Sequence, residues 1–168
     1  KVLPLFIYLL VAVGLGWFFS IRLLQTPLGL TADEGGFGIN AVLLSKTGHD
    51  ENGRFLPFFV LSLNGTDWRQ PVTQYYMAGF FKLFGSTVFN LRLTSVIIAV
   101  VSTGLIYFLA GSLLDKRWAI LAAVVFVTTP IIMIQAHLGL DNIMPVPFAL
   151  LWLMALLAFE KKRQPGWL

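Results

Sequence analysis

Two adjacent acids, Asp33 and Glu34, are the strongest candidates for catalytic chemistry in this sequence. They follow an uncharged N-terminal stretch by about a dozen residues and stand directly before Gly35-Gly36. A carboxylate at a membrane surface can act as a general base toward an incoming hydroxyl or amine, and neighbouring glycines let a bulky substrate approach the backbone. The structural alternative is that both acids cap a helix and complement its dipole. The sequence alone leaves both interpretations open.

A third acid, Asp141, interrupts what is otherwise one apolar region from Trp118 to Phe159. An acid inside such a region is costly unless it lies at the membrane interface or faces a protein cavity. The alternative is a turn residue, since Gly139 to Asn142 has the composition of a turn. We favour the functional interpretation, because the topology predicted below places Asp141 on the same side as Asp33, and perturbed acids gather at sites.

Cationic and imidazole side chains flank these acids. Arg69 and Arg92 lie on either side of a predicted helix and can hold a phosphate near the headgroups, although interfacial arginines also contact anionic lipids without any catalytic role. His137 lies four residues before Asp141 and shares its face if the helix continues that far. The run His49-Asp50-Glu51 has metal-ligand side chains, but three consecutive residues do not converge on one ion without an unusual turn. No metal site is therefore predicted, and the cofactor stays unassigned, a divalent metal being the alternative.

The composition indicates which class of protein these residues belong to. Of 168 residues, 57% are hydrophobic and 12% charged, whereas soluble domains carry roughly 25% charged residues. The 15 Phe and 5 Trp exclude a disordered chain, and the absence of cysteine excludes a disulfide scaffold or a thiolate metal site. The net charge of +4 does not indicate nucleic acid, because the basic residues stand at the edges of apolar runs.

Uncharged stretches long enough to cross a bilayer predict four transmembrane helices. The first is longer than the apolar core of a signal peptide, and no small-residue cleavage motif follows Ser20. Lys116, Arg117 and the run Lys161 to Arg163 fall on one side, which predicts cytoplasmic termini and an extracytoplasmic loop. The predicted spans cover about residues 2–21, 93–114, 118–140 and 142–159, and the predicted outer loop covers residues 22–92.

Within the loop, two stretches have helical periodicity. Ile39, Val42 and Leu43 mark a helix that follows the acids and ends at Gly48, and a stronger amphipathic pattern runs from Pro71 to Phe84. The segment 47–66 between them is predicted to be irregular or a hairpin. The predicted fold is an all-α polytopic transmembrane bundle whose long extracytoplasmic loop carries amphipathic interfacial helices. We expect residues 1–168 to be the N-terminal transmembrane part of a larger protein.

The order of these motifs resembles the N-terminal membrane region of the GT-C glycosyltransferases, in particular the protein O-mannosyltransferase and aminoarabinose-transferase-like group. One span leads to a loop that opens with Asp33-Glu34, and a proline-led helix with Tyr75 and Tyr76 follows. The later elements that carry the resemblance are Leu83-Phe84-Gly85, Phe89-Asn90-Leu91-Arg92-Leu93, Thr129-Pro130 and Asp141. The chain departs from the group where Arg69-Gln70-Pro71-Val72 replaces a basic residue or His with two prolines, and where His137 replaces an Arg.

The resemblance implies an inverting transfer of a sugar from a polyprenyl-phosphate carrier to a protein, lipid or glycan acceptor on the outer face of the membrane. Asp33 matches the family's catalytic acid, and Glu34 and Asp141 match acids that support the same site. Arg69 or Arg92 would stabilise the leaving phosphate. The expected substrate- or phosphate-binding residues are Arg69, Arg92, Tyr75, Tyr76 and His137. The isolated fragment is expected to be inactive.

Two other functions stay open. A transporter or channel segment could use Asp33 and Asp141 in an ion path, but it predicts acids near the bilayer midplane, and these acids stand at span ends. In a non-catalytic membrane subunit, both acids would be dispensable.

Overall fold

The computed structural model describes residues 2–62 and 65–162, with side chains for residues 6–62 and 65–160. Seven helices and two short strands follow one another in this part of the chain. They are α1 (Val2–Ser20), α2 (Ala32–Thr47), β1 (Val60–Ser62), β2 (Asp67–Arg69), α3 (Pro71–Phe84), α4 (Val88–Leu113), α5 (Lys116–Thr128), α6 (Pro130–Ala136) and α7 (Pro145–Lys162).

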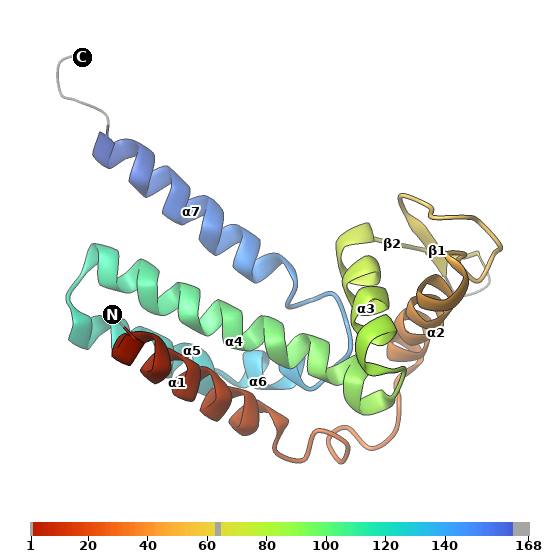
Figure 1. Cartoon of the computed structure of the whole chain (residues 1–168), viewed down its shortest axis with the longest axis horizontal. Helices are drawn as coiled ribbons and strands as arrows, with labels where there is room; N and C mark the ends of the chain where they lie inside the picture. The colour runs from red at the N-terminus through yellow and green to blue at the C-terminus, as the bar shows by residue number, and fades with distance from the viewer. Residues whose placement is uncertain (1, 63–64, 163–168) are drawn as a thin grey trace.

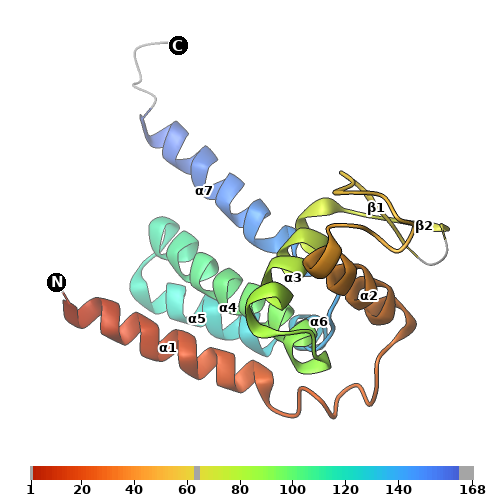
Figure 2. The same cartoon turned by 45° about the vertical axis from the view of Figure 1, so that its right-hand side comes forward.

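The helices form a bundle with a cap at one end. α1, α5, α6 and α7 all contact α4, which is the central helix (Figure 1). The start of α1, the α4–α5 turn and the end of α7 lie at one end of the molecule. At the other end α2, α3 and the β1–β2 hairpin lie together in both views (Figure 1 and Figure 2). The segment 22–92 and the Asp141 turn therefore meet at the same end.

One described helix, α4, is long and apolar enough to cross a membrane. α5 and α6 together meet the same criterion but are bent by 61° at their junction, and α1 and α7 contain shorter apolar helices. The span predicted at 118–140 is therefore broken at Thr129-Pro130, and its crossing of the membrane stays a prediction. Thr129 is extended (φ −67°, ψ 121°) before Pro130, because a residue that precedes proline avoids the helical conformation and proline has no N–H to donate.

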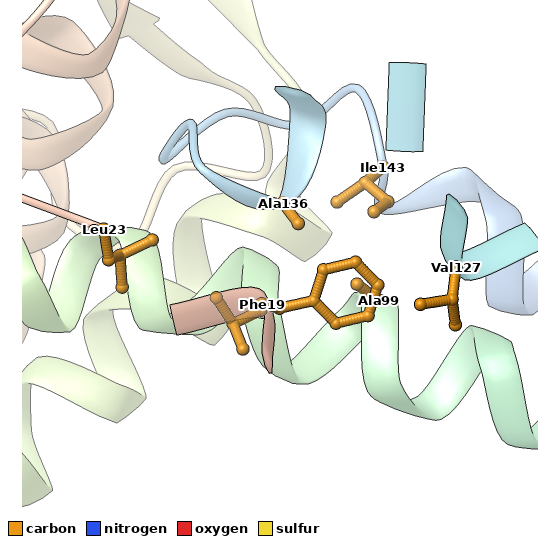
Figure 3. Packing of buried hydrophobic residues seen from close by; sticks show 7 residues of the cluster. Phe19, Leu23, Ala99, Val127, Ala136 and Ile143 are labelled. Atoms are coloured by element: carbon orange, nitrogen blue, oxygen red, sulfur yellow. The ribbon is translucent and has the colours of Figure 1, made fainter. Parts of the chain in front are cut away.

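Apolar side chains join the bundle helices near the capped end. Phe19 of α1 is fully buried against Ala99 of α4, and Val127, Ala136 and Ile143 complete the cluster (Figure 3). These residues come from four helices and from the turn before α7, so their packing fixes how α1, α4, α5 and α6 lie against one another. Between membrane helices, close packing of this kind stabilises through van der Waals contacts rather than through removal of apolar surface from water.

The two predicted loop helices are present. α2 begins one residue before Asp33, with Thr31 as its N-cap, and ends at Gly48, whose φ of 73° favours glycine. Its buried side chains include Phe37, Ala41 and Leu44, whereas Ile39 is 54% exposed. α3 spans the predicted residues and begins at Pro71, and it buries Met77, Ala78 and Phe81.

The all-α prediction is wrong in one detail, since β1 and β2 form an antiparallel hairpin in which Val60 pairs with Arg69. A hairpin was one of two predicted alternatives for the segment 47–66. β1 lies within this segment, and β2 begins directly after it. Buried Asn40 of α2 holds it in place, because its amide donates to Ser62 Oγ and its oxygen accepts from Glu51 N–H. The hairpin thereby positions Arg69 beside α2.

Candidate functional site

Glu34 is a buried anchor at the start of α2. Its side chain is fully buried and accepts hydrogen bonds from Arg92 Nε (2.9 Å), Arg92 Nη2 (3.1 Å), Thr31 N–H (3.1 Å) and Gly139 N–H (3.0 Å). Thr31 also receives a hydrogen bond from Glu34 N–H, so the two residues form a capping box. Every favourable direction around this carboxylate is occupied, and Glu34 therefore cannot contact a substrate in this arrangement.

Arg92 saturates its hydrogen-bonding capacity within the chain. A guanidinium has five N–H donors. Two reach Glu34, and the other three reach the carbonyl oxygens of Leu23, Pro27 and Gly29. No donor is left for a phosphate, so the geometry contradicts the prediction that Arg92 binds one. Arg92 instead ties the segment after α1 and the start of α2 to α4.

Opposing effects set the protonation of Glu34. Burial alone would raise the pKa of its carboxyl group, but the hydrogen bonds from Arg92, Gly139 and Thr31 and the Arg92 charge outweigh burial and hold the pKa below its usual value. Glu34 is therefore ionised at neutral pH. An ionised, fully paired carboxylate is suited to hold Asp33 and Gly139 in place, which is a positioning role rather than a catalytic one.

Asp33 has the opposite environment although it is the adjacent residue. Its side chain is 64% exposed, and its nearest charged partner is Arg69, whose Nη2 lies 3.5 Å from Oδ1. At this distance the ion pair is loose, so the carboxylate can still accept a proton from another molecule. Both acids lie in the first turn of α2, where they complement the helix dipole, but the capping box is formed by Thr31 and Glu34 and does not include Asp33.

Arg69 is held beside Asp33 by three contacts. Its guanidinium lies 4.3 Å from the centre of the Phe37 ring, and its Nη2 lies 2.7 Å from Asp67 Oδ2 in addition to the longer contact with Asp33. Its side chain is only 11% exposed, and its buried Nε has no hydrogen-bond partner among the described residues. Arg69 is therefore a mostly buried cation that is paired with two carboxylates, one of them the exposed Asp33.

Asp141 joins the same site through the residue that follows Arg69. Gln70 Nε2 donates to Asp141 Oδ2 at 3.0 Å, although the two residues are 71 positions apart in the sequence. The dipeptide Arg69-Gln70 therefore connects Asp33 on one side with Asp141 on the other. The sequence singled out both acids and Arg69, and the structure brings all three together.

The remaining predicted residues, His137, Tyr75 and Tyr76, contact the backbone of other segments. His137 Nδ1 lies 3.0 Å from Thr26 O, which links the third predicted span to the segment after α1. Tyr75 donates to Pro57 O at 2.8 Å, and burial and the Asp50 charge raise its pKa. Burial raises the pKa of Tyr76 to about 12, and its protonated hydroxyl donates to Thr94 O at 3.2 Å. These three contacts are to the backbone, and substrate binding by these residues stays a prediction.

Gly139 is a residue of this site that the sequence did not single out. Its N–H reaches Glu34, and a Cβ added to it would overlap Leu91 Cγ and lie 3.0 Å from Leu91 Cδ2. Only glycine lets the Asp141 turn approach α4 this closely. The sequence signal for Gly139 was its position two residues before Asp141. On the sequence alone, Gly139 was attributed only to the composition of a turn. No group of three or more His, Asp or Glu side chains that could hold a metal occurs among the described residues.

Fold and site together define a helical membrane protein with an acidic, arginine-containing site at one end of its bundle. A family model described as dolichyl-phosphate-mannose-protein mannosyltransferase matches residues 69–168, which is more than half of the chain. The chain therefore belongs to this family, as the sequence resemblance predicted. At the family level it is a membrane glycosyltransferase of the mannosyltransferase type that uses a polyprenyl-phosphate-linked sugar.

The matched residues include Arg69, Arg92, His137 and Asp141, whereas Asp33 and Glu34 precede them. Neither the curated proteins nor the solved structures contain a match to this chain. The assignment of Asp33 therefore depends on the contacts that join it to the matched part.

Proposed function

We propose that the full-length protein transfers a sugar from a polyprenyl-phosphate carrier to an acceptor on the extracytoplasmic face of the membrane, with inversion, and that Asp33 is the general base. Family membership supports the reaction class. One observation supports the choice of Asp33. Of the two adjacent acids, Glu34 is buried and fully hydrogen-bonded, whereas Asp33 is 64% exposed beside a buried arginine.

The chemistry follows from these positions. The acceptor hydroxyl or amine attacks the anomeric carbon while Asp33 removes its proton, and the bond to the carrier phosphate breaks with its electron pair on the phosphate oxygen. Negative charge that develops on the leaving phosphate is stabilised by the positive charge of Arg69, whose guanidinium lies beside Asp33. Asp141 holds Gln70, and through it the adjacent Arg69, in position.

We propose that the protein is a multi-pass protein of the cytoplasmic membrane with this site on the extracytoplasmic side. The positive residues of the Asp115 turn and of the end of α7 support this orientation. Turnover is expected to require the rest of the larger protein, so the fragment alone is expected to be inactive. The sugar and the acceptor are unassigned.

A transporter that uses Asp33 and Asp141 is the alternative function. It needs acids along a path through the bilayer, whereas both acids lie at the capped end, outside the long apolar helix α4. Family membership also favours transfer chemistry over transport.

The test is sugar transfer from a polyprenyl-phosphate donor by the full-length protein in detergent or liposomes. Asp33→Asn keeps the size and exposure of the side chain but removes its basicity, so turnover should fall by about 10²–10⁴-fold. Asp141→Asn should cause a smaller loss, because the amide can still bond to Gln70.

The matched control is Glu160→Gln, which neutralises an exposed acid in α7 far from the site and should leave turnover unchanged. Elution profile and thermal unfolding check that each variant is folded. Full turnover by folded Asp33→Asn protein would refute the assignment of the base.

A further inference from the structure

Asp67 is an acid of the capped end that has no role in the proposed reaction. It is the first residue of β2 and stands two positions before Arg69. Successive side chains of a strand point to opposite faces, so Asp67 and Arg69 lie on one face of the hairpin and Trp68 lies on the other. The strand therefore holds this acid beside the arginine of the proposed site.

Arg69 is shared unequally between two carboxylates. Its Nη2 lies 2.7 Å from Asp67 Oδ2 and 3.5 Å from Asp33 Oδ1. The shorter distance is that of a strong, charge-assisted hydrogen bond, whereas the longer one is at the limit for a hydrogen bond. The contact with Asp67 therefore holds the guanidinium, and Asp33 receives only a weak interaction from the same nitrogen.

The ring of Phe37 restricts how the guanidinium can move. Phe37 is fully buried, and the central carbon of the Arg69 guanidinium lies over its ring at 4.3 Å from the centre. A guanidinium stacked on a ring keeps its plane, so it moves within that plane, toward one carboxylate or toward the other. Loss of the Asp67 charge would let Nη2 approach Asp33.

A closer approach of Arg69 would weaken Asp33 as a base. A nearby cation stabilises the ionised form of a carboxylate, and a carboxylate stabilised in this form has less tendency to take a proton. The distance of 3.5 Å thus preserves the property that the proposed reaction needs from Asp33. Asp67 is the contact that maintains this distance.

The same contact affects a phosphate that approaches Arg69. The side chain of Asp67 is 42% exposed and that of Asp33 is more exposed still, whereas Arg69 is mostly buried. One cation shared by two carboxylates leaves a net negative charge, so the phosphate meets repulsion as well as competition from Asp67. The effect is larger for the released carrier than for the donor, because a phosphate monoester carries about −1.5 to −2 charge at neutral pH and a phosphodiester carries a single charge.

We propose that Asp67 is a positioning residue that limits how tightly Arg69 pairs with the base and with the carrier phosphate. The contact keeps Asp33 able to accept a proton, and it lets the carrier phosphate leave after the transfer. The proposal rests on the proposed function for the reaction and for the donor. Asp67 acts through Arg69 and needs no contact with the reacting atoms.

Steady-state kinetics of the full-length protein with a polyprenyl-phosphate sugar test this role. Asp67→Asn keeps the size of the side chain and removes its charge. KM for the donor and kcat should both fall by roughly two- to fivefold, the range expected for one partly exposed ion pair. Damage to the hairpin would lower kcat without lowering KM. Asp67→Glu restores the charge and should return both constants toward the wild-type values.

The matched control is Asp115→Asn, which makes the same substitution at the opposite end of the bundle. Asparagine is as good an N-cap as aspartate, so this variant loses an exposed charge and keeps the start of α5. Its KM and kcat should be unchanged. Asp67→Ser removes the charge with a smaller side chain and should reproduce Asp67→Asn. An unchanged or higher KM in folded Asp67→Asn and Asp67→Ser proteins would overturn the proposal.

A binding measurement separates this proposal from the proposed function. Polyprenyl phosphate that carries no sugar is titrated into the full-length protein in detergent by calorimetry, and Asp67→Asn should bind it at least roughly fivefold more tightly than the wild type. Arg69→Gln should abolish this gain, because Asp67 acts through Arg69. An equal gain with and without Arg69 would overturn the proposal, as would no gain at all. If the wild type binds the carrier but transfers no sugar, the proposed function is refuted, and this comparison still decides the role of Asp67.

Discussion

At the scale of single residues, the adjacent acids Asp33 and Glu34 lie in the same helical turn but in opposite environments. In the first turn of α2, successive side chains point about 100° apart, so one acid faces solvent and the other faces Arg92. The exposed acid can exchange a proton with a substrate, while the buried acid holds the turn in place. The same dipeptide thereby supplies a candidate base and its support.

Glu34→Gln tests the support. The amide removes the charge that balances buried Arg92, and breaking a buried ion pair in this way costs about 3–5 kcal/mol of stability. The variant should unfold at a clearly lower temperature in detergent, whereas Asp33→Asn and Glu160→Gln should not. A Glu34→Gln protein with the thermal stability of the wild type would contradict the buried pair.

The pH dependence of this difference follows from the lowered pKa of Glu34. A carboxyl group whose pKa in the folded state is below its usual value of 4.5 stabilises the fold fully above that pH and loses the contribution as pH falls through the folded-state value. The stability gap between wild type and Glu34→Gln should therefore be constant from neutral pH to about 4.5 and shrink in more acidic buffer. Thermal unfolding across this pH range provides the measurement.

Gly139 permits a second residue-scale prediction. In Gly139→Ala the new methyl group overlaps Leu91, and overpacking of this kind costs about 1–3 kcal/mol. Leu91→Ala alone should also destabilise, but the double variant should recover part of the loss, because the smaller side chain makes room for the methyl group. Additive losses in the thermal-unfolding cycle would show that the two residues are not in contact.

Sequence reasoning selected the residues of the site better than it assigned their roles. Asp33, Asp141 and Arg69 were identified from residue type and from their positions near span ends, and the structure places them together. The role of Arg92 was wrong, because a sequence shows that an arginine has five donors but not which carbonyl oxygens surround them. Leu23, Pro27 and Gly29 accept three of those donors, and they do so only because the segment after α1 folds back over α4.

At the scale of elements, helix boundaries could be predicted from the sequence. Pro71 and Gly85 delimit α3, and Gly48 ends α2, because proline fits the first turn of a helix and glycine adopts the positive φ that ends one. Which side chains the protein buries depends on the neighbouring segments instead. α2 and α3 bury Phe37, Met77 and Phe81 against each other and against Leu91, and residue periodicity alone does not select this set.

The N-terminus of α2 is an element-scale target, because its capping box sets the turn that presents Asp33. Thr31→Ala removes the hydroxyl that accepts from Glu34 N–H and should cost about 1 kcal/mol. Because the same turn carries the proposed base, turnover should fall as well. The control is Asp115→Ala, which removes the N-cap of α5 at the far end of the bundle and should destabilise by a similar amount without affecting turnover. Equal turnover losses in the two folded variants would argue against a positioning role for the cap.

At the scale of the whole molecule, contacts between distant segments bring the outer loop and the Asp141 turn to one end. Gln70 to Asp141, Gly139 to Glu34 and His137 to Thr26 each join residues more than 70 positions apart. The opposite end carries the α4–α5 turn with Lys116 and Arg117. This separation agrees with the charge asymmetry in the sequence, in which the short connection at Asp141 has no Lys or Arg.

A labelling experiment tests which end faces the cytoplasm. The chain contains no cysteine, so one cysteine can be introduced at a time, at Lys46 near the end of α2 or at Lys116 at the start of α5, both of which are exposed. If the predicted orientation is correct, a membrane-impermeant thiol reagent applied to intact cells should label Lys46→Cys and leave Lys116→Cys unlabelled until the membrane is opened. Permeabilised cells provide the control, since both positions should then react. Labelling of both cysteines in intact cells would contradict the topology, and labelling of Lys116→Cys alone would place the Asp33 site on the cytoplasmic side and exclude transfer at the outer face.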